Sequence, residues 1–448
     1  MLFAATATVD NSEVYRLIRS VRKALRRGDP AEAEQHCRSL LALEPTHEAA
    51  LDFLAIRALE SGDAAHARAI TEQGLVATPD SALLHFHRGC ALEATAEHGL
   101  ARDAFDQAFG NDSQLLEALF RRGGQENVLG LHETMLQTYI QALSLAKKNG
   151  LLGSGQQLPD TYRTGISRAI DTVQDAREEV LDRVLSPLRA RHGPAALARI
   201  QRALDVYLGK AAIEWPHPLQ RPTFLLIPDL PPRPWFDRED FPFLILMENA
   251  VAGIREEMLA VLEDEAQLSP YVNMAEDAPA APVWRELNRS LRWSSYHLFR
   301  HGRRIDAHCQ RCPKTVAALE SLPIMRIPEH SPEALFSVLK PRTHIPPHTG
   351  VINGRLTVHL PLVVPENCGA LKAGGEARVW EQGRCLVFDD SMVHEAWNHS
   401  DQTRVVLIFD IWNPYLSDAE REAMSAAVAA IGRFNRRYGG ANNSVESG

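Results

Sequence analysis

Four features are scarce or missing in this sequence, and each absence narrows what it can encode. The chain has only six cysteines in 448 residues, widely scattered, which gives no disulfide framework and favours a reducing compartment. Its formal charge of -9 and its pI near 6.1 argue against a general nucleic-acid binder, which needs a basic face. No run of about 18 apolar residues occurs, and the first residues lack a charged segment followed by a long apolar one. We therefore expect a cytoplasmic protein with neither a membrane span nor a signal peptide.

The first third of the sequence repeats at a fixed interval. Residues 28–61 align with residues 62–95, and a weaker third copy starts near Ala96. The period of 34 residues, a small residue in the first helix and a proline after the second resemble tetratricopeptide repeats. We expect helix hairpins that bury one apolar face against their neighbours, with each proline marking the turn into the next unit. The repeated positions are Gly28 and Gly62, Ala33 and Ala67, and Pro45 and Pro79, with Ala101 continuing the alanine position.

Such an array offers a concave surface to a protein or peptide partner. The same pattern also fits a helical spacer or a dimerisation platform, and an array this short has little groove. Periodicity alone leaves both interpretations open.

Changes in composition predict where the domains begin and end. Residues 158–210 have the alternating charges of long amphipathic helices, and residues 214–243 are rich in proline and aromatic residues, as at a domain boundary. The predicted order is tetratricopeptide-like helical repeats at 1–150, a helical connector at 151–221, a second domain at 222–430 and a flexible tail at 431–448.

From about residue 293 the sequence turns to short β-rich runs divided by Gly, Pro, Asn and Asp. Alternation is clearest where Leu356, Val358 and Leu360 are interleaved with Thr357 and His359. Short strands separated by long loops favour a double-sheet jelly roll. The predicted fold class is therefore α+β and multidomain: a helical repeat array followed by a jelly-roll, or double-stranded β-helix, domain.

Two histidines and an arginine in the last third are candidates for a metal site. His348 lies in a predicted proline-flanked loop that leads into the alternating strand, His394 comes 46 residues later, and Arg404 opens the next predicted strand. Neutral imidazoles suit ferrous iron, and an arginine fork binds a carboxylate with two hydrogen bonds, so the order fits a 2-oxoglutarate oxygenase. The pair alone is a weak signal in a chain with 18 histidines, and Gly350 stands where a His-x-Asp motif would carry its carboxylate.

The surrounding motifs are more specific. The runs "FSVLKPRTHIPPHTG", "NGRLTVHLPL", "FDDSMVHEAWN" and "TRVVLIFDIWNP" together resemble the aspartyl/asparaginyl β-hydroxylase family, over roughly residues 222–420. That family binds iron through two histidines and no protein carboxylate, so the resemblance accounts for Gly350. It implies an Fe(II)- and 2-oxoglutarate-dependent dioxygenase that uses O2 and hydroxylates the β-carbon of Asp or Asn in a peptide or protein.

The resemblance also implies individual roles. His348 and His394 resemble the iron ligands, Arg404 and Ser337 the groups at the far carboxylate of 2-oxoglutarate, His359 a residue near its C1 end, and Arg355 a binder of the substrate carboxylate. This chain departs from the animal enzymes at Thr357 and Leu335, where they have an arginine and a lysine. The loss of both cations leaves open whether the substrate is the same acidic side chain.

Several alternatives remain at this point. A repeat-bearing interaction protein with an inactive jelly roll, a hydroxylase of acyl chains or small metabolites, and a halogenase that uses the free coordination position are all compatible with the residues. Cys309 and Cys312 could hold zinc or cycle as a dithiol, although a structural zinc needs four ligands and no second pair is near. Asp389 and Asp390 could orient a histidine or form a turn, and we expect His344 to be structural.

Overall fold

The computed structural model describes residues 11–152, 158, 160–276, 278 and 280–439. The chain divides into two compact units. The first contains the residues up to Ala176 and a short piece that begins at Arg437, and the second contains Arg177–Arg436. The boundary between the units falls inside helix α9 (Asp160–His192). Residues 440–448, which belong to the predicted tail, lie outside the described residues.

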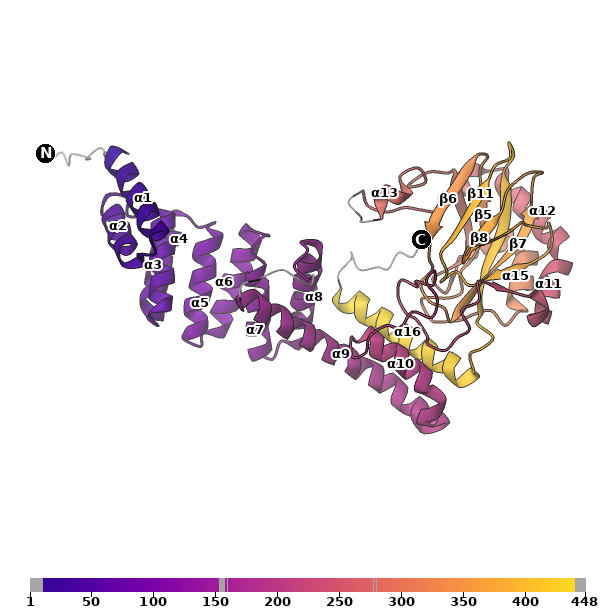
Figure 1. Cartoon of the computed structure of the whole chain (residues 1–448), viewed down its shortest axis with the longest axis horizontal. Coiled ribbons are helices and arrows are strands. Elements are labelled where there is room, and N and C mark those ends of the chain that lie inside the picture. The colour runs from indigo at the N-terminus through magenta and orange to yellow at the C-terminus, as the bar shows by residue number, and fades with distance from the viewer. Residues whose placement is uncertain (1–10, 153–157, 159, 277, 279, 440–448) are drawn as a thin grey trace. The chain divides into compact units, whose positions relative to one another are not determined.

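The first unit is an array of helix hairpins, visible as the indigo-to-purple part of Figure 1. The first helices of successive hairpins start at residues 30, 64, 98 and 132, and the second helices start at 48, 82 and 116, so both series advance by 34 residues. This spacing confirms the predicted tetratricopeptide-like repeat. The helices are α1 (Asn11–Arg26), α2 (Pro30–Leu43), α3 (Glu48–Glu60), α4 (Ala64–Ala77), α5 (Ala82–Ala94), α6 (His98–Asn111), α7 (Leu116–Val128) and α8 (His132–Lys148).

Small residues at repeated positions allow the close approach of neighbouring helices. The predicted alanines Ala33, Ala67 and Ala101 are all fully buried. A second series was not predicted: a Cβ added at Gly89 would lie 2.6 Å from the ring of Phe105, and the equivalent pair 34 residues on is Gly123 and Tyr139, at 2.2 Å. The aromatic ring of one helix therefore packs directly on the backbone of the helix before it.

Prolines and glycines alternate along the turns of the array. Pro45 follows α2 and Pro79 follows α4, and each comes just after the end of a helix. The turns before α2 and α4 are made by Gly28 and Gly62, whose φ angles of 72° and 80° are left-handed and favour glycine. The third copy has Ala96 at this place, with a φ of 60°.

The second unit contains two antiparallel sheets. The larger has eight strands in the order β1-β10-β7-β12-β5-β3-β2, with β4 paired to β3, and the smaller has four in the order β6-β11-β8-β9. The strands are β1 (Trp235–Phe236), β2 (Ser269–Pro270), β3 (Trp293–Arg300), β4 (Arg303–Arg304), β5 (Ala334–Leu339), β6 (Thr343–His348), β7 (Arg355–Val363), β8 (Leu371–Ala373), β9 (Glu376–Arg378), β10 (Leu386–Phe388), β11 (His394–Asn398) and β12 (Arg404–Trp412).

The second unit also contains helices of different lengths. The α-helices are α10 (Ala198–Tyr207), α11 (Ile245–Asn249), α12 (Val251–Leu262), α13 (Ala281–Trp284), α14 (Asp306–Arg311), α15 (Pro313–Glu320) and α16 (Asp418–Tyr438). The 3₁₀ helices are Pro194–Leu197, Arg238–Asp240, Pro242–Leu244 and Glu265–Gln267. Figure 1 shows α12 and α15 on the side of the larger sheet that faces away from the smaller one.

The alternation predicted for β7 determines which side chains reach the space between the sheets. Leu356, Val358 and Leu360 pack with the apolar residues of α12 and α15 in one core. Thr357 and His359 point from the opposite face of the same strand. Strands β3, β5 and β12 alternate in the same way, so one face of the larger sheet is a helix-covered core and the other is free to carry polar groups.

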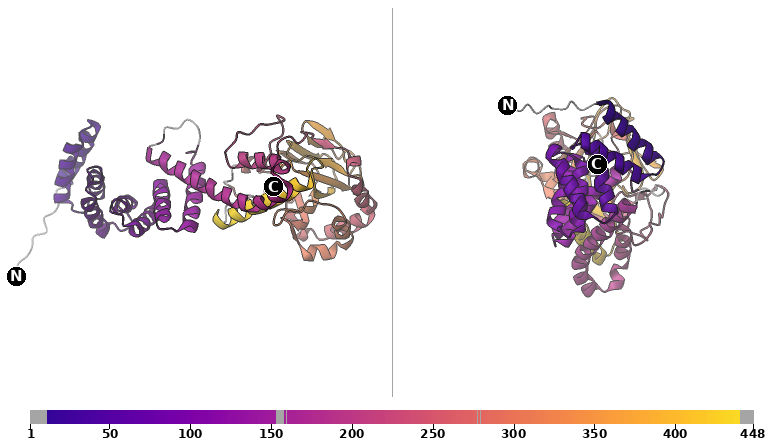
Figure 2. Two further views of the ribbon diagram at one scale, coloured as in Figure 1. Left: turned by 90° about the horizontal axis from the view of Figure 1, so that it is seen from below. Right: turned by 90° about the vertical axis from the view of Figure 1, so that its left-hand side faces the viewer.

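Helix α16 closes a separate core with the C-terminal part of α9 and with α10. Figure 2 shows this helix, in yellow, beside those two helices. It continues to Tyr438, although the sequence analysis placed a flexible tail from residue 431. The reason is that Ile431 and Phe434 continue the buried stripe of the helix beyond the predicted domain end.

Candidate active site

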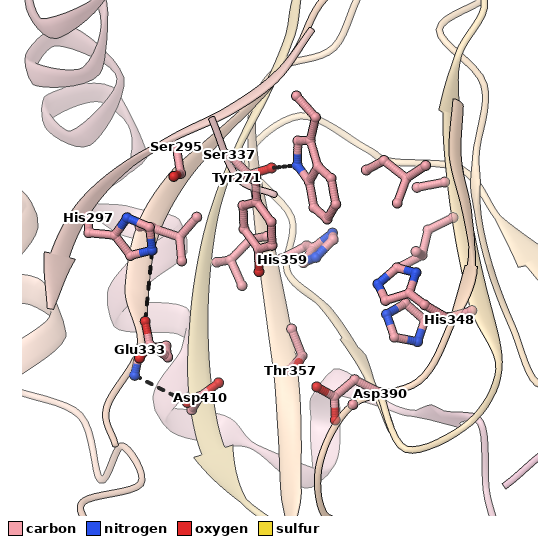
Figure 3. A pocket seen from close by; sticks show the side chains of 18 of the residues that line it. Tyr271, Ser295, His297, Glu333, Ser337, His348, Thr357, His359, Asp390 and Asp410 are labelled. Carbon is pink, nitrogen blue, oxygen red and sulfur yellow. Dashed lines mark hydrogen bonds and ion pairs between the residues drawn. The ribbon is translucent and has the colours of Figure 1, made fainter. Parts of the chain in front are cut away.

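A polar pocket lies between the two sheets of the second unit. Its walls come from β3, β5, β7 and β12 of the larger sheet and from β6 and β11 of the smaller one, and Figure 3 shows it from close by. All six residues that the sequence analysis selected line it or border it: His348, Arg355, His359, His394 and Arg404, together with Ser337. Segments far apart in the sequence therefore converge on one cavity.

Strand pairing brings the two histidines together. His348 is the last residue of β6 and His394 is the first residue of β11, and the two are direct partners in the antiparallel ladder. Their ring centroids are 4.0 Å apart. The sequence analysis placed His348 in a loop, and the structure corrects this, since the strand begins five residues earlier at Thr343.

Both imidazoles are held in one orientation by the backbone. Nδ1 of His348 donates to the carbonyl of Pro346 at 2.8 Å, and Nδ1 of His394 donates to the carbonyl of Met392 at 2.9 Å. Burial lowers the pKa of His348 to about 3 and that of His394 to about 4, so both rings are neutral. A neutral ring with its proton on Nδ1 has a free lone pair on Nε2, which is the form in which histidine binds metals.

The place of the missing carboxylate is already filled. A Cβ at Gly350 would lie 2.4 Å from the carboxyl carbon of Asp390, so no side chain fits at position 350 without moving that residue. Asp390 itself forms an ion pair with Arg355. Within the described ranges of the chain, no group of three or more His, Cys, Asp or Glu side chains is arranged to hold a metal ion.

Arg404 is the most unusual charge in the pocket. It is 1% exposed, its Nε and Nη1 atoms have no hydrogen-bond partner, and among the described residues no carboxylate forms an ion pair with it. Its guanidinium carbon lies 4.6 Å from the ring centroid of Trp380, and burial lowers its pKa to about 10. A buried cation without a partner is costly unless an anion completes it, so this side chain fits an anionic ligand.

His359 and Ser337 lie beside this arginine. Nδ1 of His359 accepts a hydrogen bond from Nε1 of Trp380 at 3.3 Å, and burial lowers the pKa of the ring well below its usual value. The Ser337 hydroxyl accepts from Nε1 of Trp293 at 3.1 Å and retains its own proton for donation. Neutral donors and acceptors thus surround the single cation at this end of the pocket.

Arg355 is held between two carboxylates. Besides its ion pair with Asp390, its Nη1 lies 3.6 Å from Oδ2 of Asp410. Burial by itself would lower the pKa of Arg355, but the two carboxylates outweigh this effect and raise it above its usual value. Asp410 was not predicted as a site residue. The period of two along β12 could have indicated it, because residues 404, 408 and 410 lie on the same face of that strand and line the pocket.

The other candidates from the sequence have ordinary structural roles. Cys309 and Cys312 are buried, and burial raises the pKa of both thiols, to about 12 for Cys312. Nε2 of His344 lies 2.9 Å from a carboxylate oxygen of Glu395. Asp389 accepts from the backbone N–H of Ser391 and from Nε2 of Gln220, which is the hydrogen-bond pattern of a turn former.

Comparison with known proteins places this arrangement in a family. Residues 248–414 match the family model of aspartyl/asparaginyl β-hydroxylase. Aspartate β-hydroxylase domain-containing protein 1 of Mus musculus is 31% identical over 296 residues, which are 65% of this chain and 78% of that protein. Ornithine lipid ester-linked acyl 2-hydroxylase of Rhizobium tropici is 33% identical over 188 residues, 42% of this chain and 63% of that protein. Aspartyl/asparaginyl β-hydroxylase of Homo sapiens is 32% identical over 197 residues, 43% of this chain and 24% of that protein.

These matches define the class of protein: the relatives are named for hydroxylases, and the family match at residues 248–414 lies within the sheet-bearing unit. The chain belongs to the aspartyl/asparaginyl β-hydroxylase family. It spans less than two thirds of the Rhizobium protein and about a quarter of the human one. Among solved structures, a MamA protein matches at a TM-score of 0.31 with 17% identity, over 46% of this chain and 98% of that chain. No helix among the described residues is both long and apolar enough to cross a membrane.

Proposed function

We propose that this protein is an Fe(II)- and 2-oxoglutarate-dependent dioxygenase that hydroxylates a C–H bond, and that its two sheets form a double-stranded β-helix. The observation that carries the proposal is the pair His348 and His394. The two rings lie on adjacent strands with their centroids 4.0 Å apart, and each Nδ1 is bound to a backbone carbonyl. Two neutral imidazoles that present Nε2 to one cavity are a donor set that suits ferrous iron.

The residues around this pair fit the keto acid. Arg404 would bind the far carboxylate of 2-oxoglutarate, because it is buried and its Nε and Nη1 atoms find no hydrogen-bond partner in the described part of the protein. Ser337 can donate to the same carboxylate, and His359 lies toward the histidine pair, where the C1 end would sit. When bound, iron and 2-oxoglutarate supply the activation of O2, coupled to oxidative decarboxylation of the keto acid to succinate and CO2.

The protein contributes orientation and exclusion of water. The hydrogen bonds from Nδ1 fix both imidazoles before any ligand arrives, so little conformational entropy is lost on binding. Trp380 lies over the guanidinium of Arg404 and keeps that cation dry. In such an environment, the attraction between the guanidinium and a carboxylate is much stronger than in water.

The family and the names of its members make the β-carbon of Asp or Asn in a peptide or protein the first candidate for the hydroxylated position. A fatty acyl chain is the second, because the Rhizobium relative is named as an acyl 2-hydroxylase and because Leu335 and Ile408 line this pocket. The rival account, an inactive interaction protein, conflicts with the intact arrangement of His348, His394 and Arg404.

The repeats would recruit the polypeptide substrate. We assign this role to residues 1–150, the connection to residues 151–221 and the chemistry to residues 222–430. Tetratricopeptide-like hairpins stack into a surface suited to peptides. In the described part of this array, equivalent helices start at four successive positions, residues 30, 64, 98 and 132.

Turnover of 2-oxoglutarate tests the proposal. The purified protein should convert it to succinate when Fe(II) and O2 are present, even without a substrate, at a slow uncoupled rate. The His394→Ala and Arg404→Ala variants should lose this turnover, whereas His344→Ala should retain it, because His344 is exposed and pairs with Glu395 outside the pocket. Succinate formation that is unchanged in His394→Ala would contradict the assignment.

A further inference from the structure

The half of the pocket farther from the histidine pair has a distinct charge pattern. We call it the acidic half and define it by Tyr271, His297, Glu333, Arg355 and Asp410. Figure 3 shows Glu333, His297 and Asp410 on one side, with Tyr271 between them and His348. A substrate that reaches the histidine pair from this side passes these groups.

The single buried cation in this half is already neutralised. Arg355 is ion-paired with Asp390, and its Nη1 lies 3.6 Å from Asp410. A substrate carboxylate would have to displace one of these two protein carboxylates. A substrate carboxylate would also be repelled by the like charge of Glu333, and this repulsion would weaken its binding further.

Among the described residues, the Glu333 carboxylate has two histidine rings and one backbone donor as its partners. One carboxylate oxygen lies 3.2 Å from Nδ1 of His301, and the other lies 3.9 Å from Nε2 of His297. The backbone N–H of His301 donates to the first oxygen. These partners carry no permanent positive charge, so among the described residues Glu333 has no direct ion pair with a lysine or arginine at the wall of the pocket.

An unpartnered acceptor faces the same space. Asp390 is more than nine-tenths buried, and its Oδ1 atom has no hydrogen-bond partner within the described part of the chain. In Figure 3 its carboxyl group points toward Thr357 in the middle of the pocket. Buried acceptors are normally satisfied, so this atom indicates that a ligand donates there.

Arg300 is a further cation among the described residues that line the pocket. Its side chain is exposed to solvent, where water and salt screen its charge. The buried charges of the acidic half are therefore the ones that discriminate between ligands. Arg355 is balanced by its partner Asp390, which leaves Asp410 and Glu333 as two carboxylates in excess of the buried cations among the described residues that line this half.

We propose that the acidic half of the pocket binds a protonated amine or guanidinium of the substrate, between Glu333 and the Tyr271 ring, and that it selects against a carboxylate there, which disfavours Asp relative to Asn and to an acyl chain among the candidates of the proposed function. A cation there gains the attraction of Glu333, donates to the free acceptor of Asp390 and stacks on an aromatic face. That the bound group belongs to the hydroxylated substrate rests on the proposed function. The selectivity for a cation does not require iron.

Binding of small probes to the full chain tests the selectivity. Calorimetric titrations would use N-acetyl-lysine methylamide, N-acetyl-arginine methylamide and N-acetyl-aspartate methylamide, with and without saturating 2-oxoglutarate, since a free carboxylate can otherwise enter at Arg404. Glycerophosphoethanolamine provides a second source of ammonium, so its affinity relative to the capped lysine distinguishes a lipid headgroup from a peptide side chain.

The informative variant is Glu333→Gln, which keeps the size of the side chain and an acceptor for the His301 N–H. We expect the Kd of the capped lysine to rise about tenfold in this variant and that of the capped aspartate to fall. Glu376→Gln is the matched control, because Glu376 is exposed on β9, outside the pocket. It should leave every Kd unchanged.

Three results would overturn the inference. They are tighter binding of the capped aspartate than of the capped lysine with 2-oxoglutarate present, an unchanged lysine Kd in Glu333→Gln, and no measurable binding of any cationic probe. Loss of succinate formation with retained selectivity for cations would instead refute the proposed function and leave the charge preference standing.

Discussion

Substitution of Gly350 tests how the site dispenses with a carboxylate at this position. In Gly350→Ala, the new methyl group would lie 2.4 Å from Cγ and Oδ2 of Asp390 and 2.6 Å from Oδ1. Asp390 is buried and tied to Arg355, so it cannot rotate away without breaking that ion pair.

The expected loss of stability has two contributions. Overpacking of a tight site costs about 1–3 kcal/mol, and breaking a buried ion pair costs about 3–5 kcal/mol when one partner is left uncompensated. Arg355 keeps its contact with Asp410, so we expect the variant to lose about 2–5 kcal/mol in total, less than the sum of the two maxima. For a unit of this size, that corresponds to a fall of roughly 5–15 °C in the unfolding midpoint.

Tryptophan fluorescence isolates the relevant unit, because all seven tryptophans lie between residues 215 and 412. The double variant Gly350→Ala/Asp390→Ala provides the control. Removing the carboxyl group removes the clash, so the two substitutions should be coupled by about 1 kcal/mol or more. Gly350→Asp should be less stable than Gly350→Ala, because it adds a second buried carboxylate. An unchanged midpoint in Gly350→Ala, or strict additivity in the double variant, would refute the reasoning.

Three further predictions concern other parts of the molecule. Trp380→Phe removes the indole N–H and weakens the contact with Arg404, so the KM for 2-oxoglutarate should rise about tenfold in succinate assays. Burial raises the pKa of Asp389 from 3.8 to about 7, so the folded state loses stability as the pH rises from about 4, where the unfolded chain starts to ionise, to about 7. Asp389→Asn should therefore remove up to about 3 kcal/mol of pH-dependent stability, measured by tryptophan fluorescence. In the repeats, Ala96→Gly relieves a left-handed residue and should stabilise by up to about 1 kcal/mol, whereas Gly62→Ala should destabilise by a similar amount, both followed by far-UV circular dichroism. Midpoints that move in the opposite directions would contradict these assignments.

The repeats and the main strand could be predicted because their patterns are local. The 34-residue period is visible in single positions such as Ala33 and Ala67, which must be small for the helices to approach. The alternation from Leu356 to Leu360 determines which face of β7 is buried by helices and which faces the pocket. Both follow from periodicities of 3.6 and 2 residues.

The strands that carry the two histidines could not be predicted from their composition. Strand β6 contains Pro346 and Pro347, which normally argue against a strand, but β6 is at the edge of the smaller sheet, where missing N–H groups are tolerated. Strand β11 has only five residues. Neither gives a periodic signal, so the direct pairing of His348 with His394 appears only in the structure.

The charge pattern of the pocket depends on contacts between distant segments. Arg355 was assigned to a substrate carboxylate by resemblance. Strand periodicity puts Asp410 on the pocket face of β12, but it does not show that Asp390 and Asp410 compensate the charge of Arg355. The first carboxylate comes from a turn 35 residues later and the second from another strand. Such pairings depend on the register of the sheets, which composition and motif spacing leave undetermined.

The measurement that tests the central claim most directly is an anaerobic titration of the purified protein with Fe(II) and then 2-oxoglutarate, followed by visible absorption. The proposed site predicts a weak metal-to-ligand charge-transfer band that disappears in His394→Ala and in Arg404→Ala and persists in His344→Ala. A folded protein that shows no band and retains no iron would contradict the assignment of His348 and His394, and attention would turn to the partners of the repeats.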